Sequence, residues 1–291
     1  MLPEEIAARV WPGRELVLEP LGGGITNHNF KVIAHGEPFV LRIGGKDTAL
    51  LGIDRDAEHA ATRIAAELGV GPEVIAFVEP GGYLVTRFVE GRPLAVEEVR
   101  LPERLRSIAG ILRRVHEGPP FPARFDSFRV VESYVATARA CGVTPPSAHD
   151  RAKAIAERIE HARGAQQAVP CHNDLLNANF IAAGDEVRLV DWEYAGMGDR
   201  FFDLANFSIN HELDDSENEE LLASYFGELD PDDLRALRLM RFMSDFREAM
   251  WGVVQQGVSE LDFDFVGYTQ EHFERLERTA SDPGFQAALA G

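Results

Sequence analysis

Residues 171–180 read Cys-His-Asn-Asp-Leu-Leu-Asn-Ala-Asn-Phe and place His172, Asp174 and Asn179 in the spacing H-x-D-x-x-x-x-N. A second aspartate, Asp191, ends the apolar run that follows. In such a set one carboxylate can accept a proton from a hydroxyl, while an amide oxygen and another carboxylate can bind Mg²⁺. The stretch therefore predicts a phosphotransferase that uses a nucleoside triphosphate and magnesium.

The sequence between the two motifs strengthens this interpretation. Residues 180–182 and 187–190 have strand character and flank a Gly-Asp pair at 184–185, which is a hairpin signal. A hairpin at this point brings two distant pieces of sequence to one place. The spacing alone is weak support for a catalytic loop, whereas the same spacing followed by a hairpin and an aspartate at a strand end is specific.

The composition is that of an ordinary globular protein. The chain has 291 residues, 45% of them hydrophobic, which is enough for one large domain or two lobes with a substantial core. No stretch reaches the ~18 apolar residues that a membrane helix needs, and Cys141 and Cys171 form no zinc or C-x-x-C pattern. Residues 1–5 are acidic and lack the basic start of a secretion signal. A cytoplasmic protein without membrane insertion is expected.

The net charge of −19 argues against nucleic acid as a partner, because nucleic-acid phosphates need a basic surface. Two explanations of the acidity remain, solubility and attraction of a cationic substrate. Charge alone does not locate a site, so both stay open.

A glycine cluster lies near the amino terminus, at residues 21–27, Leu-Gly-Gly-Gly-Ile-Thr-Asn. It separates two runs with strand alternation, residues 15–19 and 28–34, and a helix is expected before them at residues 3–9. Two interpretations are open: a flexible hairpin turn, or a backbone that approaches phosphate oxygens and offers them N–H groups. The cluster is no Walker loop, since no Gly-Lys-Ser/Thr follows, and no dinucleotide fingerprint, since a strand follows.

A third strand, residues 37–43, carries Arg42 in an otherwise apolar run, and a buried cation needs a partner. Residues 54–68 predict a helix with Asp54 as its N-cap. Glu58, one turn into this helix, is the natural partner, because kinase-like folds hold a phosphate-binding strand cation with a helix carboxylate. The alternative is a surface arginine and a first-turn glutamate favoured by the helix dipole.

Residues 73–79 and 83–89 complete a sheet of about five strands, and the break at residues 90–93, Glu-Gly-Arg-Pro, indicates a hinge. Adenine is expected between the lobes, against backbone groups around Thr86 and Phe88.

Helical spacing dominates after the hinge. Helices are expected at residues 102–116, 130–140 and 148–163. The chain is therefore expected to form an amino-terminal nucleotide-binding lobe, residues 1–90, and a carboxy-terminal catalytic and acceptor-binding lobe, residues 91–291.

Six stretches carry a family resemblance: G-G-G-I-T-N-H-N-F-K-V, F-V-L-R-I, D-R-D-A-E, C-H-N-D-L-L-N-A-N-F, V-D-W-E-Y-A-G-M-G-D-R-F-F-D-L-A-N and M-W-G-V-V-Q. They resemble the choline/ethanolamine kinase branch of the aminoglycoside-phosphotransferase-like, protein-kinase-like superfamily. The arginine in the third strand and D-W-E-Y in place of D-F-G both favour this branch.

The resemblance implies an α+β, two-lobed protein-kinase-like fold. The small amino-terminal lobe would hold a five-stranded antiparallel sheet plus a helix, and the large carboxy-terminal lobe would be mainly helical. The resemblance also implies ATP and Mg²⁺ as cofactors, phosphoryl transfer to a small alcohol and, in many members, a homodimer.

Position by position, the resemblance implies that Asp174 is the catalytic base beside the substrate hydroxyl and that His172 braces the loop. Asn179 and Asp191 would hold Mg²⁺ between the ATP phosphates. Asp203, in F-F-D-L-A-N, would anchor the loop by hydrogen bonds. Phosphoryl transfer depends on alignment and neutralised charge, which such a set supplies.

The same transfer assigns the phosphate-binding residues of the first lobe. Arg42 would contact phosphate and Glu58 would orient Arg42. The backbone expected to cover the phosphates belongs to Gly23, Gly24, Ile25, Thr26 and Asn27.

For the acceptor, the resemblance implies an aromatic cage, because ring quadrupoles attract quaternary ammonium ions. Its expected members are Tyr194, Trp251 and Tyr268. Glu248 stands where choline kinases have another tryptophan, and Asn210, with Glu212 nearby, stands where they have a glutamate. Glu193 is also expected on the acceptor side. A carboxylate suits an amine that donates hydrogen bonds, so the expected substrate is a small cationic amino alcohol. Ordinary helix packing is the alternative for Trp251 and Tyr268.

Two kinds of rival function remain. One is a related kinase with another amine-bearing acceptor, such as an aminoglycoside, thiamine or an amino sugar. The other is a non-catalytic nucleotide-binding regulator, which would usually lack the base or a metal ligand. Asp174, Asn179 and Asp191 are all present, which favours an enzyme.

Overall fold

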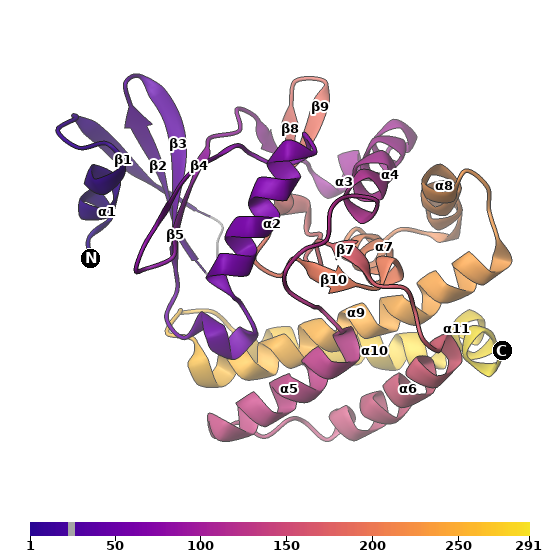
Figure 1. Cartoon of the computed structure of the whole chain (residues 1–291). Coiled ribbons are helices and arrows are strands. Elements are labelled where there is room, and N and C mark those ends of the chain that lie inside the picture. Colours follow the sequence, from indigo (N-terminus) through magenta and orange to yellow (C-terminus); the bar gives the residue numbers. More distant parts are fainter. Residues whose placement is uncertain (23–26) are drawn as a thin grey trace.

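An antiparallel sheet forms the amino-terminal lobe in the computed structural model of the protein, which describes residues 1–22 and 27–291 (Figure 1). Its strand order is β1-β2-β3-β5-β4. The strands are β1 (Leu16–Leu21), β2 (Asn27–Ala34), β3 (Glu37–Gly44), β4 (Val74–Val78) and β5 (Tyr83–Arg87). The five-stranded antiparallel sheet implied by the resemblance is confirmed, with β4 and β5 shorter than the predicted runs.

Two helices accompany this sheet, α1 (Pro3–Val10) and α2 (Arg55–Glu67), with a short 3-10 helix, η1 (Thr48–Leu51), before α2. The sheet and α1 enclose a small core of alternating apolar residues that includes Ile6, Val32, Leu41 and Val85. Because strand side chains alternate between faces, these residues reach one side of the sheet together.

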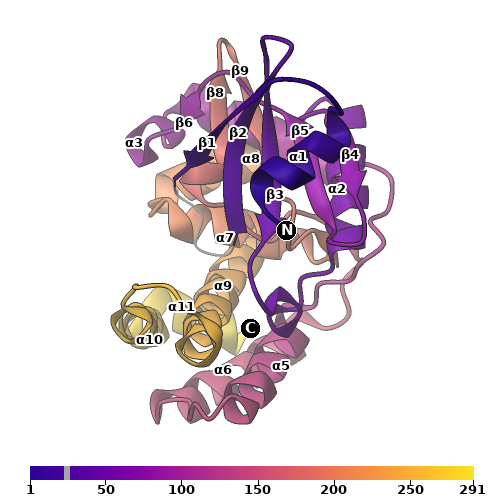
Figure 2. The ribbon, with the colours of Figure 1, turned by 90° about the vertical axis from the view of Figure 1, so that its left-hand side faces the viewer.

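The carboxy-terminal lobe is mainly helical, as predicted. Its helices are α3 (Val96–Val99), α4 (Pro102–His116), α5 (Ser127–Ala140), α6 (Ala148–Arg163), α7 (Arg200–Asn210), α8 (Asp215–Phe226), α9 (Pro231–Val258), α10 (Phe265–Ser281) and α11 (Pro283–Ala290). The long helix α9 runs through this lobe and packs against α10, α7 and α5 (Figures 1 and 2). The expected helix at 130–140 begins earlier, because Asp126 caps it by accepting hydrogen bonds from the amides of Phe128 and Arg129.

Short strands connect the helical lobe to the lobe junction. A three-stranded sheet has the order β6-β8-β9, and β7 pairs with β10. These strands are β6 (Arg92–Pro93), β7 (Val169–Cys171), β8 (Phe180–Ala183), β9 (Glu186–Leu189) and β10 (Gly196–Gly198), and the 3-10 helix η2 (Asn177–Asn179) precedes β8. The predicted hairpin is therefore present as β8–β9. The division of the chain at residues 90 and 91 stays a prediction.

The predicted hinge holds a strand, β6, which pairs with β8 through Arg92 opposite Ala182. The chain thus joins the carboxy-terminal lobe directly after leaving β5. A Cβ atom at Gly91 would lie 2.1 Å from the carbonyl oxygen of Ala182, so only glycine allows this close approach.

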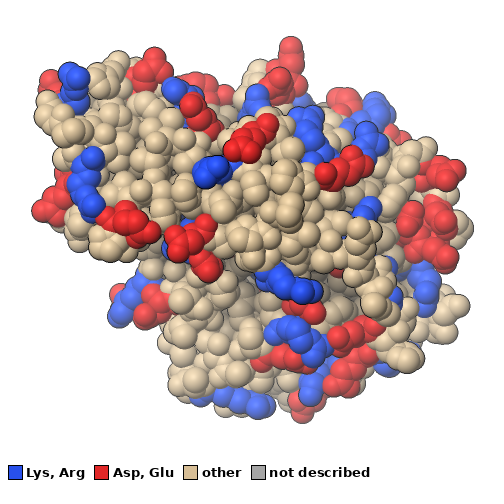
Figure 3. Space-filling view, in the orientation of Figure 1, with Lys and Arg blue, Asp and Glu red and all other residues tan. Residues whose placement is uncertain are grey.

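Charged side chains of both signs are interspersed over the face of the molecule drawn in Figure 3. Among the described residues, no helix is both long enough and apolar enough to cross a membrane.

Candidate active site

Helix α7 holds the loop that follows β7. The Asp203 carboxylate accepts hydrogen bonds from the backbone amides of His172, at 2.7 Å, and Asn173, at 2.6 Å. One turn later, Asn206 Oδ1 accepts from the amide of Leu175 at 2.6 Å. Asn173 adopts a left-handed backbone with φ of 67°, a conformation that asparagine tolerates better than most residues. The D-L-A-N segment of α7 therefore sets the path of the loop.

His172 is buried and links two parts of the site. Its Nδ1 accepts from the amide of Asp174 at 3.2 Å, and its Nε2 donates to the carbonyl of Val190 at 3.1 Å. The ring lies against Trp192, with 4.6 Å between ring centroids. Burial lowers the pKa of His172, so the imidazole stays neutral. These bonds tie the loop to the chain segment that carries Asp191.

Asp174 lies next to Asn179, whose Nδ2 donates to the Asp174 carbonyl at 2.9 Å and to its Oδ2 at 3.4 Å. The Asn179 carbonyl in turn accepts from the amide of Val190 at 3.0 Å. Burial raises the pKa of Asp174 to about 7, with further increases from the charges of Glu248 and Asp191 and a decrease from Arg247. A carboxylate with this pKa can exchange a proton near neutrality.

Arg42 joins the two lobes. Its Nη1 bonds Glu58 Oε1 at 2.8 Å and also bonds Asp191 Oδ1. Burial favours the neutral form of Asp191, but the charge of Arg42 and the hydrogen bond from it outweigh burial and lower the Asp191 pKa. Asp191 therefore remains ionised. The Arg42–Glu58 pair expected from the sequence is present as a contact in the structure.

Arg55 is part of this cluster, and no role was predicted for it. Its Nη1 bonds Glu58 Oε2 at 2.6 Å and Glu193 Oε2 at 3.3 Å, and its Nη2 donates to Asn27 Oδ1 at 2.8 Å. The only signal was its position in D-R-D-A-E, directly after the cap of α2.

Glu193 faces the amino-terminal lobe, where its Oε2 accepts from Asn27 Nδ2 at 2.8 Å. Burial raises the pKa of Glu193 to about 8, with the Asp191 charge adding to the effect. The acceptor role of Glu193 stays a prediction. Of the predicted phosphate-covering segment, only Asn27 is described, and residues 23–26 lie outside the described residues.

A cavity of about 340 Å³ lies between the lobes. Arg42, Glu58 and Asp191 line its polar end. Its other lining residues include Gly22, Val40, Leu84, Thr86, Phe88, Ile181 and Trp192. The amide of Phe88 donates to the Pro38 carbonyl at 3.2 Å, and which backbone groups would bind adenine stays a prediction.

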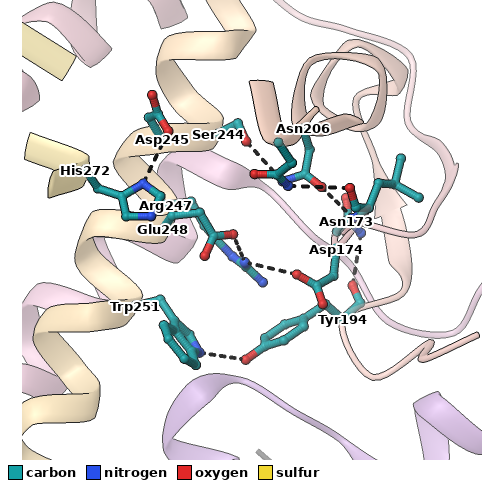
Figure 4. A network of polar contacts seen from close by, with 12 residues as sticks. Asn173, Asp174, Tyr194, Asn206, Ser244, Asp245, Arg247, Glu248, Trp251 and His272 are labelled. Carbon is teal, nitrogen blue, oxygen red and sulfur yellow. Dashed lines mark hydrogen bonds and ion pairs between the residues drawn. The ribbon is translucent and has the colours of Figure 1, made fainter. Parts of the chain in front are cut away.

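Among the predicted aromatic residues, Trp251 contacts both Tyr194, as Figure 4 shows, and Tyr268. Trp251 Nε1 donates to the Tyr194 hydroxyl at 3.0 Å, and the Trp251 and Tyr268 rings meet edge to face at 5.7 Å. The Tyr268 hydroxyl donates to Glu248 Oε2 at 3.0 Å. Asn210 lies at the end of α7, where its Nδ2 donates to the Leu175 carbonyl at 3.5 Å.

Arg247 was also missed by sequence reasoning. It is buried, and its guanidinium carbon lies 4.3 Å from the centroid of the Tyr194 ring. Its Nη1 bonds Glu248 Oε1 and lies 3.5 Å from Asp174 Oδ1. Helix α9 is buried on several faces, so residue spacing could not show which of its side chains meets Asp174.

The oxygen atoms near Asp174 suit a hard cation. Asn179 uses its amide nitrogen on Asp174, which leaves its Oδ1 as a ligand, and Asp191 supplies an ionised carboxylate. Amide and carboxylate oxygens are the ligands that Mg²⁺ prefers. The residues present therefore fit a magnesium ion.

Comparison with known proteins finds that a model of the phosphotransferase enzyme family matches residues 17–239. Protein LicA of Haemophilus influenzae is 29% identical over 210 residues, which cover 70% of this chain and 61% of LicA, so the match spans less than two thirds of that relative. The choline/ethanolamine kinase of Rattus norvegicus is 25% identical over 318 residues, covering 89% of this chain and 79% of that kinase.

Among solved structures, a choline/ethanolamine kinase family protein from Mesorhizobium loti superposes with a TM-score of 0.84 at 31% identity. The superposition covers 99% of this chain and 96% of that one. The likeness therefore extends over both lobes.

Proposed function

The chain belongs to the phosphotransferase enzyme family, in its choline/ethanolamine kinase branch, and on this premise we propose that it is an ATP-dependent kinase for a small amino alcohol. The γ-phosphoryl group would pass to the hydroxyl of the acceptor. One observation carries this proposal: Asp174 lies 3.5 Å from Arg247, which is paired with Glu248, and the charge of Asp191 also acts on it.

Asp174 is the base of the proposed reaction. With a pKa of about 7 it is partly ionised at neutral pH and can accept the hydroxyl proton as the phosphoryl group transfers. Asp203 and Asn206 hold the loop backbone, and Asn179 bonds the Asp174 carboxylate and carbonyl. Alignment of this kind supplies a large part of the rate in phosphoryl transfer.

Arg42, held by Glu58, offers positive charge at the polar end of the cavity between the lobes. We assign the triphosphate to this end and the adenine to the part lined by Thr86 and Phe88. Asn179 and Asp191 would hold Mg²⁺, which when bound neutralises charge on the phosphates. The cytoplasmic location and the homodimer stay predictions.

A small acceptor is favoured over a large polycationic one. Tyr194, Glu248 and Trp251 are buried and bonded to their neighbours, whereas a large antibiotic needs an open acidic trough. The presence of Asp174, Asn179 and Asp191 in one place favours an enzyme over a non-catalytic regulator.

The test is magnesium-dependent ATP consumption with a panel of amino alcohols, measured for the wild type and for Asp174→Asn. We expect the substitution to lower kcat by about 10²–10⁴-fold, the usual contribution of a general base. Asp185→Asn, at the exposed turn of the β8–β9 hairpin, is the matched control and should retain activity. Unchanged turnover in Asp174→Asn would refute the mechanism.

A further inference from the structure

Arg247 stands in the acceptor site with part of its hydrogen-bonding capacity unused. The residue is 1% exposed. Its Nη1 forms the ion pair with Glu248 and lies near the Asp174 carboxylate. Within the part of the chain that the structure describes, Arg247 Nε and Nη2 are buried and have no hydrogen-bond partner. Burying donors without hydrogen-bond partners costs folding free energy, so we expect these two nitrogen atoms to bind a ligand.

The two nitrogen atoms form one edge of the guanidinium. Nε and the Nη2 on its side direct two N–H groups in parallel, and this fork matches the two oxygens of a carboxylate. The Tyr194 ring covers one face of the guanidinium, so a partner for the unused edge would have to lie in the guanidinium plane. Figure 4 shows the guanidinium between Glu248 and Asp174, with Tyr194 and Trp251 on the same side of the site.

A substrate that carries only positive charge does not explain this arrangement. The Tyr194 ring and the Glu248 carboxylate are the groups that would attract an ammonium ion, and both already contact Arg247. The second oxygen of Glu248 accepts from the Tyr268 hydroxyl. A purely cationic acceptor would therefore have to place its positive charge beside the guanidinium of Arg247.

We propose that the acceptor is an amino alcohol that also carries a carboxylate, and that Arg247 binds this carboxylate through Nε and Nη2. The inference rests on the proposed kinase function and narrows its substrate class. In the reaction the acceptor oxygen bonds to the γ-phosphorus, the bond from that phosphorus to the β–γ bridging oxygen breaks, ADP leaves, and the hydroxyl proton goes to Asp174. Arg247, beside Asp174, would hold the carboxylate close to the reacting hydroxyl.

The test compares matched acceptors that differ only by a carboxylate on the amine-bearing carbon. The pairs are ethanolamine with serine and 3-aminopropan-1-ol with homoserine, and choline is added as a purely cationic compound. We expect the wild type to prefer the carboxylated member of at least one pair by about tenfold or more in kcat/KM, because a site built to bond a group rejects the analogue that lacks it.

The variants use the ratio of kcat/KM values within a pair as the readout. In the double variant Arg247→Met/Glu248→Gln, which removes both charges of the buried ion pair together, the ratio should fall by about tenfold or more. Arg247→Lys keeps the charge but loses the fork, so its ratio should lie between those of the wild type and the double variant. Thermal unfolding checks that each variant is folded. A second measurement compares the rise in the wild-type Tm on adding homoserine with the rise on adding 3-aminopropan-1-ol.

The outcomes separate this inference from the proposed function. A wild-type preference for choline or for the acceptors without a carboxylate overturns the carboxylate assignment and leaves the kinase intact. If the double variant lost kcat/KM equally for both members of a pair, Arg247 would support Asp174 or the phosphoryl group instead. Failure to phosphorylate any amino alcohol overturns both proposals.

Discussion

At the scale of single residues, two carboxylates of the site, Asp191 and Asp174, have pKa values shifted in opposite directions. The charge of Arg42 keeps the pKa of Asp191 low in spite of burial, whereas burial raises the pKa of Asp174 to about 7. Asp191 therefore stays ionised, as its proposed role as a metal ligand requires, while Asp174 can exchange a proton. Separation of this kind between neighbouring acids is typical of sites that assign them different roles.

His211 provides a pH-dependent contribution to stability. Its Nδ1 donates to the Phe207 carbonyl at 2.7 Å, and within the described residues its buried Nε2 has no partner. Burial lowers the pKa of His211 to about 4 from an ordinary value of 6.5. The unfolded chain therefore binds a proton more readily, so the stabilisation is fully present above pH ~6.5 and is lost as the pH falls towards about 4.

We expect His211→Phe to reduce the difference in unfolding free energy between pH 7 and pH 5 by about 2 kcal/mol, the linkage value for this shift at pH 5. Urea unfolding at both pH values measures it. The exposed His161→Phe is the control for the aromatic substitution. A wild-type and a His211→Phe protein with the same pH dependence would contradict the assigned pKa.

At the scale of elements, helix α2 positions the carboxylate that holds Arg42. Its cap, Asp54 Oδ1, accepts from the amides of Asp56 at 2.9 Å and Ala57 at 3.1 Å. Glu58 follows within the first helical turn and bonds both Arg42 and Arg55. A well-defined helix start therefore determines where the arginine of β3 is held.

The effect of the α2 cap on ATP binding can be separated from the effect of an N-cap on stability. Asp54→Ala and Asp126→Ala each remove an N-cap whose oxygen accepts from two amides, and each should cost about 0.5–2 kcal/mol of unfolding free energy. Only Asp54→Ala should also raise the KM for ATP, because α5 packs against α9 and lies away from β3, which carries Arg42 (Figure 1). Equal KM values in the two variants would show that the start of α2 does not position Glu58.

At the scale of the whole molecule, the two lobes meet where β5 passes into β6. The pairing of β6 with β8 joins this segment to the hairpin that leads to Asp191. Arg42 and Arg55 reach across the junction to Asp191 and Glu193. The proposed active site therefore draws residues from both lobes and lies at their junction.

Gly91→Ala tests this junction. The added Cβ would lie 2.1 Å from the Ala182 carbonyl oxygen, so β6 must shift, and overpacking of this kind costs about 1–3 kcal/mol. We expect lower thermal stability and a higher KM for ATP. Gly110→Ala, within α4 and with no atom of the described residues within 4 Å of the added Cβ, is the control and should gain up to about 1 kcal/mol. Wild-type behaviour of Gly91→Ala would contradict the close approach at β6.

Much of the fold could be predicted from local patterns, and much of the site could not. Alternation gave the strands of the first lobe, because half-buried strands show their period in the sequence. The N-cap of α2, Asp54, and the Gly184 turn were likewise visible in short stretches. The start of α5 was misplaced because its cap, Asp126, precedes the apolar periodicity.

The sequence by itself determined the reaction class and the paired elements that support it. H-x-D-x-x-x-x-N, the hairpin and Asp191 lie within one short stretch, and Arg42 and Glu58 sit on neighbouring elements. Only the tertiary structure decided that Arg55 completes the Arg42 cluster, that Glu193 turns to Asn27, and that Arg247 faces Asp174. These contacts join distant parts of the chain, and α9 is too widely buried for its period to show which side chain meets which neighbour.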